Sequence, residues 1–260
     1  MAELPLGWTT DLAVLDAAGA RITGHCDYLL VRSAGNPGYH WGNFILVLDE
    51  GAVDEPERWV ATFERHFPCA EHRAIGLPCA ADPSLWNRVG LELGADEALL
   101  AESMPQSRPL PAGYTVRQLS DPGDWRRSAE AHIAEHSRAG GEVGDAYEAF
   151  EFRLMHSSMR IAERGLGASF GVFAGDRLVA QLGIVKCGPR ARYQGVLTDV
   201  DHRRRGLAGH LLGVAADWAR TQGNRQWVIV AEPDSPAGRL YRSVGFVPTD
   251  RSYQAYRAKA

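Results

Sequence analysis

With 260 residues, a hydrophobic fraction of 45% and a formal net charge of -4, the chain suits one large or two small folded domains. The negative charge argues against a nucleic-acid-binding surface, and no apolar run reaches the ~20 residues needed to cross a membrane. The first residues lack the basic and apolar segments of a secretory signal, so we expect a cytoplasmic protein. Four cysteines without CxxC spacing predict reduced and mostly buried thiols.

A proline-rich segment divides the sequence into two lobes. Residues 103–113 contain three prolines and interrupt the pattern on either side, which predicts a linker. Residues 1–102 form the smaller, N-terminal α/β lobe, and no repeat is visible between its sequence and the remainder. The elements predicted in this lobe are strands at 28–32, 44–48 and 97–101 and a helix at 55–66.

The larger domain, residues 114–260, has a clearer pattern. Hairpin-type turn residues at 174–176 and 187–190 predict that the strands around them form an antiparallel meander. Ser235 and Pro236 form the start signal of a short helix, and Gly245 its stop signal. The predicted elements are strands at 114–117, 169–173, 177–186, 191–200 and 226–231, helices at 124–138 and 145–164, a helix after Gly206, the short helix, and strand-like segments at 246–247 and 253–256.

The most informative motif is the run Asp-His-Arg-Arg-Arg-Gly-Leu-Ala-Gly at residues 201–209. It follows a predicted strand, and the apolar residues after Gly206 recur at helical spacing. A strand that turns into a helix start presents unpaired N–H groups and the positive end of the helix dipole, which together favour a phosphate. Glycine lets the phosphate approach these groups closely. A Walker loop and the GxGxxG fingerprint are both absent, so we expect a different phosphorylated cofactor.

The element order and two motifs resemble the GNAT acetyltransferase superfamily. The family motif Arg/Gln-x-x-Gly-x-Gly/Ala appears at residues 203–208, and Asn-x-x-Ala-x-x-x-Tyr-x-x-x-Gly-Phe is approximated at residues 234–246. The resemblance covers residues 114–260. It implies a mixed α/β fold of the α+β type, with a mostly antiparallel sheet flanked by helices. On element order alone, the N-terminal lobe is interpreted as a degenerate GNAT-like half.

This resemblance implies that acetyl-CoA is the cofactor and co-substrate. Backbone amides of the Arg/Gly turn would hold its pyrophosphate, and the preceding strand would pair with the amides of its pantetheine arm. Acetyl would pass to an amine by direct attack in a ternary complex, without a metal or a covalent enzyme intermediate. The expected cofactor-binding residues are Val196, Leu197, Thr198, Arg203, Arg204, Arg205, Gly206, Leu207, Ala208, Gly209 and Asp234.

The resemblance implies a tyrosine as proton donor and a general base that the sequence leaves unassigned. In the family, a tyrosine at the position of Tyr241 directs its hydroxyl to the CoA sulfur, where it protonates the departing thiolate. Many relatives carry a glutamate where this chain has Ile229, so the proton acceptor is unassigned. Glu232 and Asp199 are the candidates, with a water relay as the alternative. Asp234 replaces the usual asparagine, which removes an amide donor and leaves a capping acceptor.

Two further functions stay open. The changes at Ile229 and Asp234 are compatible with an acyl-CoA-binding sensor or interaction module that catalyses nothing. His132 and His136, spaced as His-x-x-Glu-His, match an inverted zinc-peptidase signature, but the element order supplies neither a third ligand nor the fold. The acceptor (a small-molecule amine, a peptide or an aminoglycoside-like compound), the acyl chain and the oligomeric state are not specified by the sequence.

Overall fold

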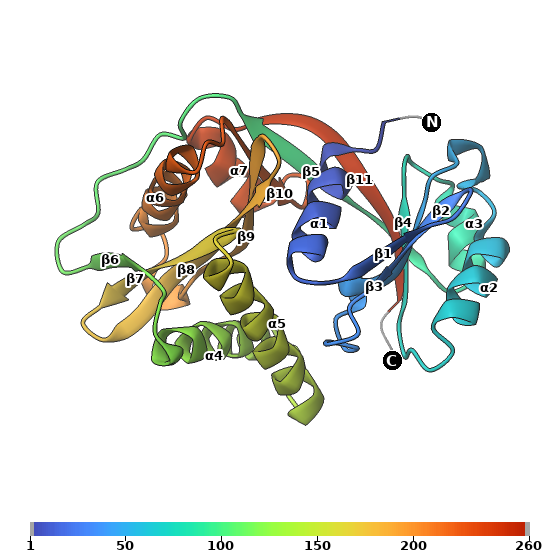
Figure 1. The fold of residues 1–260 in the computed structure, drawn as a ribbon, viewed down its shortest axis with the longest axis horizontal. Coiled ribbons are helices and arrows are strands. Elements are labelled where there is room, and N and C mark those ends of the chain that lie inside the picture. The colour runs from blue at the N-terminus through green and yellow to red at the C-terminus, as the bar shows by residue number, and fades with distance from the viewer. Residues whose placement is uncertain (1–2, 258–260) are drawn as a thin grey trace. The chain divides into compact units, whose positions relative to one another are not determined.

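The computed structural model describes residues 3–257, which fall into two compact units (Figure 1). The N-terminal unit comprises residues 3–98, 230–233 and 249–257, and the C-terminal unit comprises residues 99–229 and 234–248. This division differs from the linear one expected from the sequence. The segment 103–113 belongs to the C-terminal unit, and the end of the chain returns to the N-terminal unit because its last strand pairs there.

The N-terminal unit is built on a mixed sheet. Strands β1, β2 and β3 are antiparallel neighbours, β3 and β4 are parallel, and the last strand of the chain, β11 (Val247–Arg257), pairs antiparallel with β4. The elements in chain order are α1 (Leu6–Ala17), β1 (Arg21–Gly24), β2 (Tyr28–Arg32), β3 (Asn43–Val47), α2 (Pro56–His66), β4 (Arg73–Leu77), α3 (Pro83–Arg88) and β5 (Glu92–Ala101).

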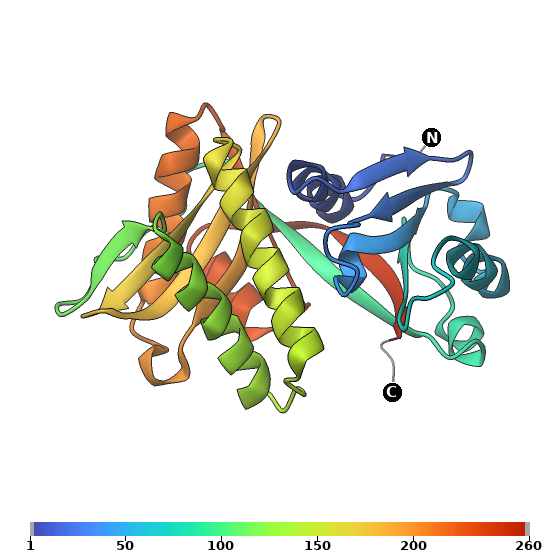
Figure 2. The same ribbon diagram turned by 60° about the horizontal axis from the view of Figure 1, so that its bottom comes forward.

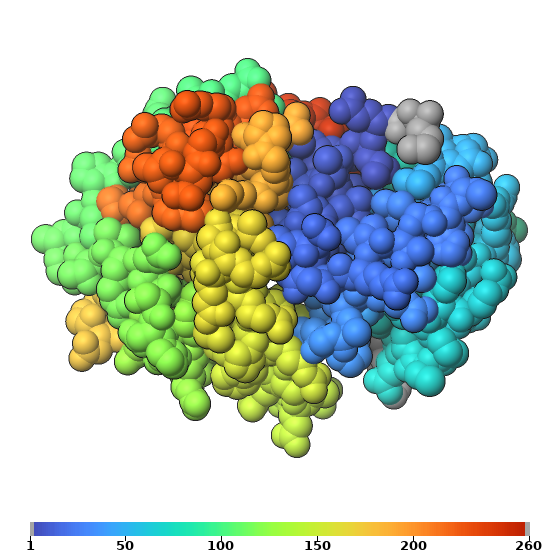
Figure 3. Space-filling model, in the orientation of Figure 1, coloured from blue at the N-terminus to red at the C-terminus, as the bar shows by residue number. Residues whose placement is uncertain are grey.

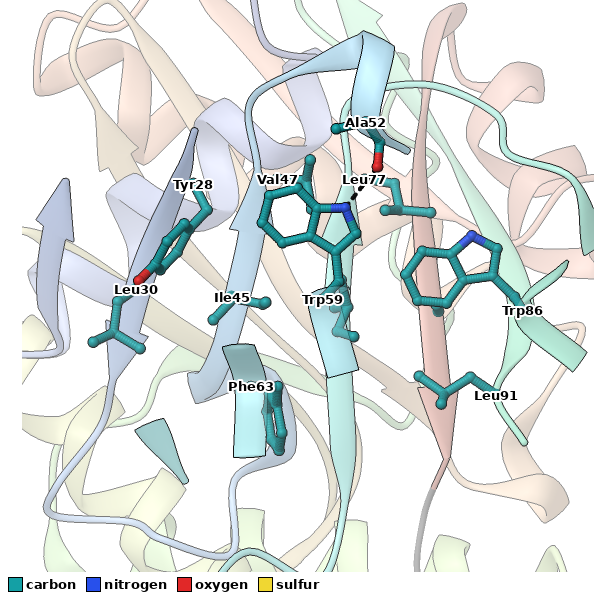
Figure 4. Close-up of a cluster of buried hydrophobic side chains, with 12 residues drawn as sticks. Tyr28, Leu30, Ile45, Val47, Ala52, Trp59, Phe63, Leu77, Trp86 and Leu91 are labelled. Atoms are coloured by element: carbon teal, nitrogen blue, oxygen red, sulfur yellow. Dashed lines mark hydrogen bonds between the residues drawn. The ribbon is translucent and has the colours of Figure 1, made fainter. Parts of the chain in front are cut away.

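Aromatic side chains fill the core beneath α2 and α3 (Figure 4). Trp59 and Phe63, one helical turn apart on α2, are buried against the strands together with Trp86 of α3. Each indole also satisfies its N–H: Trp59 Nε1 donates to Ala52 O at 2.6 Å and Trp86 Nε1 donates to Val53 O at 3.1 Å. Burial of each large side chain stabilises the unit by roughly 2–3 kcal/mol.

The C-terminal unit contains the predicted meander. Strands β7, β8 and β9 are antiparallel neighbours, β6 pairs with β7, and β10 runs parallel to β9. The elements are β6 (Thr115–Gln118), α4 (Pro122–Arg138), α5 (Asp145–Glu163), β7 (Gly167–Ala174), β8 (Arg177–Cys187), β9 (Arg190–Thr198), α6 (Leu207–Thr221), β10 (Gln226–Ala231) and α7 (Pro236–Ser243). The mixed, mostly antiparallel α/β fold expected from the sequence is confirmed.

Helices cover both faces of this meander. Figures 1 and 2 show α4 and α5 side by side on one face and α6 on the other. In the space-filling view of Figure 3, residues of α4 and α5 (green to yellow-green) lie at the surface of this unit. Helix α4 begins two residues before the predicted start at residue 124: the Asp121 side chain accepts a hydrogen bond from Asp124 N at 2.9 Å, and Pro122 occupies the first turn.

The structure bears on two expectations drawn from composition, one about membrane-spanning segments and one about the cysteines. Among residues 3–257, every helix is too short or too polar to span a bilayer. The four cysteines are free thiols, but Cys26 and Cys69 are exposed and the other two are partly exposed. The expectation of mostly buried cysteines was therefore wrong, because their positions lie outside the apolar pattern that forms the cores.

The two units repeat one connectivity, although no repeat is visible between their amino-acid sequences. From α1 the N-terminal unit runs helix, three antiparallel strands, 3-10 turn, helix, parallel strand, short helix and strand, and the chain from α5 onward runs in the same order. Even the 3-10 turns match. Asp49 accepts a hydrogen bond from Gly51 N at 2.9 Å before the first, and Asp199 accepts one from Asp201 N at 3.0 Å before the second.

Candidate active site

The turn between β9 and α6 leaves the start of α6 open. Arg204 and Gly206 both have left-handed backbones, with φ of 62° and 82°. Gly206 is the N-cap of α6, and no side chain within residues 3–257 caps this helix. The first helical hydrogen bond is donated by His210 N to Gly206 O at 3.0 Å. The N–H groups of the preceding turn, residues 207–209, therefore lack helical partners and lie at the positive end of the helix dipole.

The second open feature is the edge of β9 that faces β10. β10 pairs with β9 at Gln226, Trp227 and Val228, which lie opposite residues 190–192. Within the described chain this pairing does not extend to residues 196–198, whereas on its other edge β9 stays paired with β8 as far as Thr198. The end of β9 consequently presents main-chain groups that β10 does not pair. The Thr198 carbonyl already accepts a hydrogen bond from Arg203 Nε, and the others can bind a ligand by strand addition.

A cavity of about 460 Å³ joins these two features. Ten of the residues expected from the sequence line it: Val196, Leu197, Thr198, Arg203, Arg204, Gly206, Leu207, Ala208, Gly209 and Tyr241. The remaining lining residues are Arg108, Glu135, His202, Pro236, Ala237 and Leu240. The helix start, the strand edge and the short helix α7 thus enclose one space within the C-terminal unit.

The three consecutive arginines have different roles. Arg203 donates through Nε to Thr198 O at 3.0 Å and forms an ion pair with Glu135. Arg205 lies outside the cavity lining; it donates to the Tyr114 hydroxyl at 3.0 Å and to a main-chain carbonyl of the same turn at 3.1 Å. These two side chains hold the turn in shape. Arg204 forms no ion pair with another described residue, so its charge is available to a ligand in the cavity.

Sequence reasoning missed Arg108 and Glu135 as cavity residues. Arg108 comes from the segment interpreted as a linker, and its carbonyl accepts a hydrogen bond from His210 Nδ1 at 2.8 Å. This contact holds the segment against α6, so that the Arg108 side chain adds a second cation beside the helix start. Glu135 lies in the last turn of α4, inside the His-x-x-Glu-His run, which indicated a metal site and not this cavity. Both residues reach the cavity through tertiary packing.

Tyr241 lies on α7 and contacts the cavity although it is only 5% exposed. Its ring packs edge-on against Phe246, with ring centroids 6.3 Å apart. Burial raises the pKa of the Tyr241 hydroxyl to about 12, although the nearby positive charge of Arg192 acts in the opposite direction. The phenol is therefore protonated at neutral pH and has a proton to donate.

The other three acidic candidates lie outside the cavity lining. Burial tends to raise the pKa of Asp199, but hydrogen bonds from Asp201 N and Arg177 hold it below its usual value. This carboxylate is a cap and ion-pair partner. Glu232 and Asp234 are exposed, and the helix cap is Ser235, whose hydroxyl accepts from Gly238 N at 3.1 Å.

The two histidines of the His-x-x-Glu-His run contact different elements. His136 stacks on Tyr147 of α5 with ring centroids 3.9 Å apart. The Nε2 atom of His132 lies 3.4 Å from the point that a Cβ atom on Gly195 of β9 would occupy. Across residues 3–257, no group of three or more His, Cys, Asp or Glu side chains is arranged to hold a metal ion.

An uncapped helix start beside two parallel strands that separate is typical of an anion-binding site in an α/β domain. Residues 132–246 match the model of the acetyltransferase (GNAT) family. The C-terminal unit therefore carries a GNAT domain over these residues. No match was found among curated proteins.

Solved structures share the fold over nearly the whole chain. A GCN5-related N-acetyltransferase from Kribbella flavida has a TM-score of 0.66 and 14% identity, over 98% of this chain and 96% of its own. A functionally unknown conserved protein from Staphylococcus epidermidis has a TM-score of 0.69 and 13% identity, with coverage of 92% and 93%. A tandem GNAT protein from the clavulanic acid biosynthesis pathway has a TM-score of 0.56 and 14% identity, with coverage of 97% and 94%. At these identities the likeness shows the fold alone.

Proposed function

We propose that this protein transfers the acetyl group of acetyl-CoA to an amine that attacks it directly in a ternary complex. The observation that carries the proposal is the single cavity that joins the uncapped start of α6, the open edge of β9 and the Tyr241 hydroxyl. Bound acetyl-CoA would supply an activated acyl thioester.

The donors around the cavity fit CoA chemically. A diphosphate needs several N–H donors and positive charge, which the main chain of residues 207–209 and the side chains of Arg108 and Arg204 provide. A pantetheine arm carries two amides, and the open edge of β9 at residues 196–198 offers main-chain partners for them. The unused polar groups of the protein and those of the ligand are thus complementary.

Tyr241 is the proposed proton donor to the departing sulfur. Its raised pKa keeps it protonated at the pH at which an amine acceptor becomes a neutral nucleophile. Because the side chain is almost fully buried, its ring is also part of the core, and only the hydroxyl is available for the chemistry. Tyr241→Phe therefore separates the two roles.

We also propose that the N-terminal unit is a GNAT-like half that binds no CoA. In place of the arginines, the connection between β3 and α2 carries the acidic residues Asp49, Glu50, Asp54 and Glu55, which repel a diphosphate. The carbonyl groups of this connection already accept the indole hydrogen bonds of Trp59 and Trp86. The likeness to a tandem GNAT protein over 97% of the chain supports the same interpretation.

The test is calorimetry with CoA, followed by thiol-release assays with acetyl-CoA and a panel of small-molecule amines and peptides. We expect one CoA per chain and release that depends on an acceptor. Binding of two equivalents would contradict the closed N-terminal site. Absence of CoA binding would contradict the whole proposal.

A CoA-binding sensor is the second candidate. It is favoured by the buried Ile229 and by the positions of Asp199 and Glu232, neither of which lines the cavity. A sensor would bind CoA tightly and release no thiol with any acceptor, and Tyr241→Phe would leave both properties unchanged. Acceptor-dependent release that falls in Tyr241→Phe excludes it.

A further inference from the structure

The strongest unused group of side chains lies between α4 and α5, next to the bulge of β9. The pairing of β8 with β9 becomes irregular between Gln181 and Gly183, and opposite this point Gly195 has a left-handed φ of 56°. Gly195 immediately precedes Val196, the first cavity-lining residue of β9. His132 does not line the cavity itself, but its imidazole faces this bulge: Nε2 and Cε1 lie 3.4 and 3.6 Å from the point that a Cβ atom on Gly195 would occupy.

Carboxylates accompany this imidazole on both packed helices. On α5, Glu151 is buried, with 7% of its surface exposed, and accepts a hydrogen bond from the Tyr147 hydroxyl at 2.9 Å. On α4, Glu135 lies one turn beyond His132, lines the cavity, and is paired with Arg203 and Arg138. Glu135 is thus paired with two arginines, whereas Glu151 bonds the Tyr147 hydroxyl.

Burial lowers the pKa of His132, while the charges of Glu151 and Glu135 act in the opposite direction. Two further titratable groups of these helices contact each other: His136 stacks on Tyr147, and the pKa of Tyr147 is raised by burial and by its bond to Glu151. The net result is an imidazole that is neutral at neutral pH. Its nitrogen is therefore able to accept a proton.

We propose that His132 is the general base that takes the proton from the acceptor amine, and that Glu151 stabilises the imidazolium that forms. This inference rests on the proposed acyl transfer. The amine nitrogen forms a bond to the acyl carbon as the C–S bond breaks, and the sulfur keeps the bonding pair. The proton lost by nitrogen goes to His132 Nε2 and then to solvent, and the sulfur takes its proton from Tyr241, which solvent reprotonates. His132 thus fills the role for which Ile229 lacks a carboxylate.

The principal test is His132→Gln, with His156→Gln on the exposed face of α5 as the matched control. We expect His132→Gln to lower kcat/KM by about 100-fold or more and to abolish the acidic limb of the pH–rate profile, with partial rescue by added imidazole. The CoA dissociation constant from calorimetry should stay within about twofold of wild type, which reports a folded variant. His156→Gln should match wild type in every measurement.

A second variant tests the positioning role of Glu151 by measuring the pKa of His132. A purely structural role of Glu151 would not change this pKa. Glu151→Gln removes the negative charge that raises the His132 pKa. The pKa of His132, followed by NMR of its ring in the CoA-bound and free protein, should therefore fall, and the acidic limb of the rate profile should shift to lower pH. Tyr147→Phe leaves the Glu151 carboxylate in place. It should therefore lower neither the pKa of His132 nor the pH of the acidic limb.

The outcomes separate this inference from the proposed function. Wild-type turnover together with an unchanged rate profile in His132→Gln overturns the assignment of His132 and leaves acyl transfer standing. CoA binding without turnover by the wild type, over the full acceptor panel, overturns both. An unshifted His132 pKa in Glu151→Gln overturns the role of Glu151.

Discussion

Trp86 in the N-terminal unit holds the place that Tyr241 holds in the C-terminal unit. Each lies four residues before a left-handed glycine, Gly90 with φ of 74° and Gly245 with φ of 108°. In both units the residue after that glycine donates its N–H to the aromatic residue's carbonyl, at 3.2 Å and 3.1 Å. The two side chains then differ in what they meet: Tyr241 contacts a cavity, whereas the Trp86 indole bonds Val53 in the β3–α2 connection.

Trp86→Ala should therefore destabilise the protein without changing the number of CoA sites. Trp86 is fully buried, and removing an indole from a packed core costs about 3–5 kcal/mol. Trp86→Phe keeps an aromatic ring and loses the hydrogen bond to Val53, so a smaller loss of unfolding free energy is expected. Urea denaturation and CoA calorimetry measure both quantities. A second CoA equivalent in either variant would show that the N-terminal unit keeps a latent site.

The parts of the fold that could be predicted from the sequence are those with a strong local pattern. Elements with strong periodicity or turn chemistry, such as α4 and the β7–β9 meander, are confirmed to within a few residues. The elements that were missed are α1, β1, β4 and α3. In α1 the apolar residues are not gathered on one face, and β4 is a short buried run that resembles either a strand or a helix segment. The pairing of β11 with β4 is long-range, and no local pattern reports it.

The candidate site could be predicted only for residues that belong to a local sequence motif. The turn at residues 201–209 and Tyr241 carry local motifs, and the structure brings them to one cavity. Arg108 and His132 reach this region through packing of a loop against α6 and of α4 against β9. No local pattern marks Arg108, and the His-x-x-Glu-His run around His132 indicated a metal site instead. Asp199 and Glu232 were chosen because they lie near strand ends, a criterion that does not specify where a side chain points.

Gly206→Ala tests the helix start, with Gly223→Ala as its matched control at the other end of α6. Both glycines have left-handed backbones, and neither position is crowded, so both substitutions should cost about 1–2 kcal/mol of strain. Only Gly206 borders the cavity. Gly206→Ala should therefore also weaken CoA binding about tenfold or more, measured by calorimetry below each variant's unfolding temperature. Equal CoA affinities in the two variants would place the diphosphate elsewhere.

Tyr241→Phe should lower kcat while leaving CoA affinity and stability nearly unchanged. A positioned proton donor contributes about 100-fold or more, and the buried ring is retained. The control is Tyr193→Phe, which removes a buried hydroxyl that donates to Leu212 O at 2.7 Å. That change should cost about 1 kcal/mol of stability and leave kcat intact. Because the Tyr241 pKa is about 12, the wild-type rate should show no alkaline fall from tyrosine ionisation below pH ~11.

Asp199→Asn should weaken folding and leave the chemistry unaffected. The variant loses the ion pair with Arg177 but keeps a capping oxygen for Asp201 N, so we expect a loss of about 0.5–1 kcal/mol. The pKa of Asp199 is depressed in the folded state, so its contribution is present above pH ~4 and disappears as the pH falls further. Thermal unfolding of the wild type and Asp199→Asn at pH 7 and pH 3 measures this contribution to stability. A 100-fold fall in kcat with an unchanged unfolding temperature would instead identify Asp199 as a base.

His40 should make the N-terminal unit less stable in mild acid. Burial, aided by the charge of His72, lowers the pKa of His40 to about 4, and its Nδ1 lies 2.6 Å from the Tyr256 hydroxyl oxygen. Between pH ~6.5 and 4 the unfolded chain binds a proton that the folded state excludes, so the free energy of unfolding falls as the pH drops through this window.

His40→Gln removes that titration and should flatten the pH dependence by on the order of 1 kcal/mol after allowance for partial solvation. His156→Gln, on an exposed helix face, should retain the wild-type slope. Urea unfolding at pH 7.0 and pH 4.5, followed by tryptophan fluorescence, makes the comparison, since Trp8, Trp41, Trp59 and Trp86 all lie in this unit. A His40→Gln slope as steep as that of the wild type would mean that His40 protonates as readily in the folded state as in the unfolded chain.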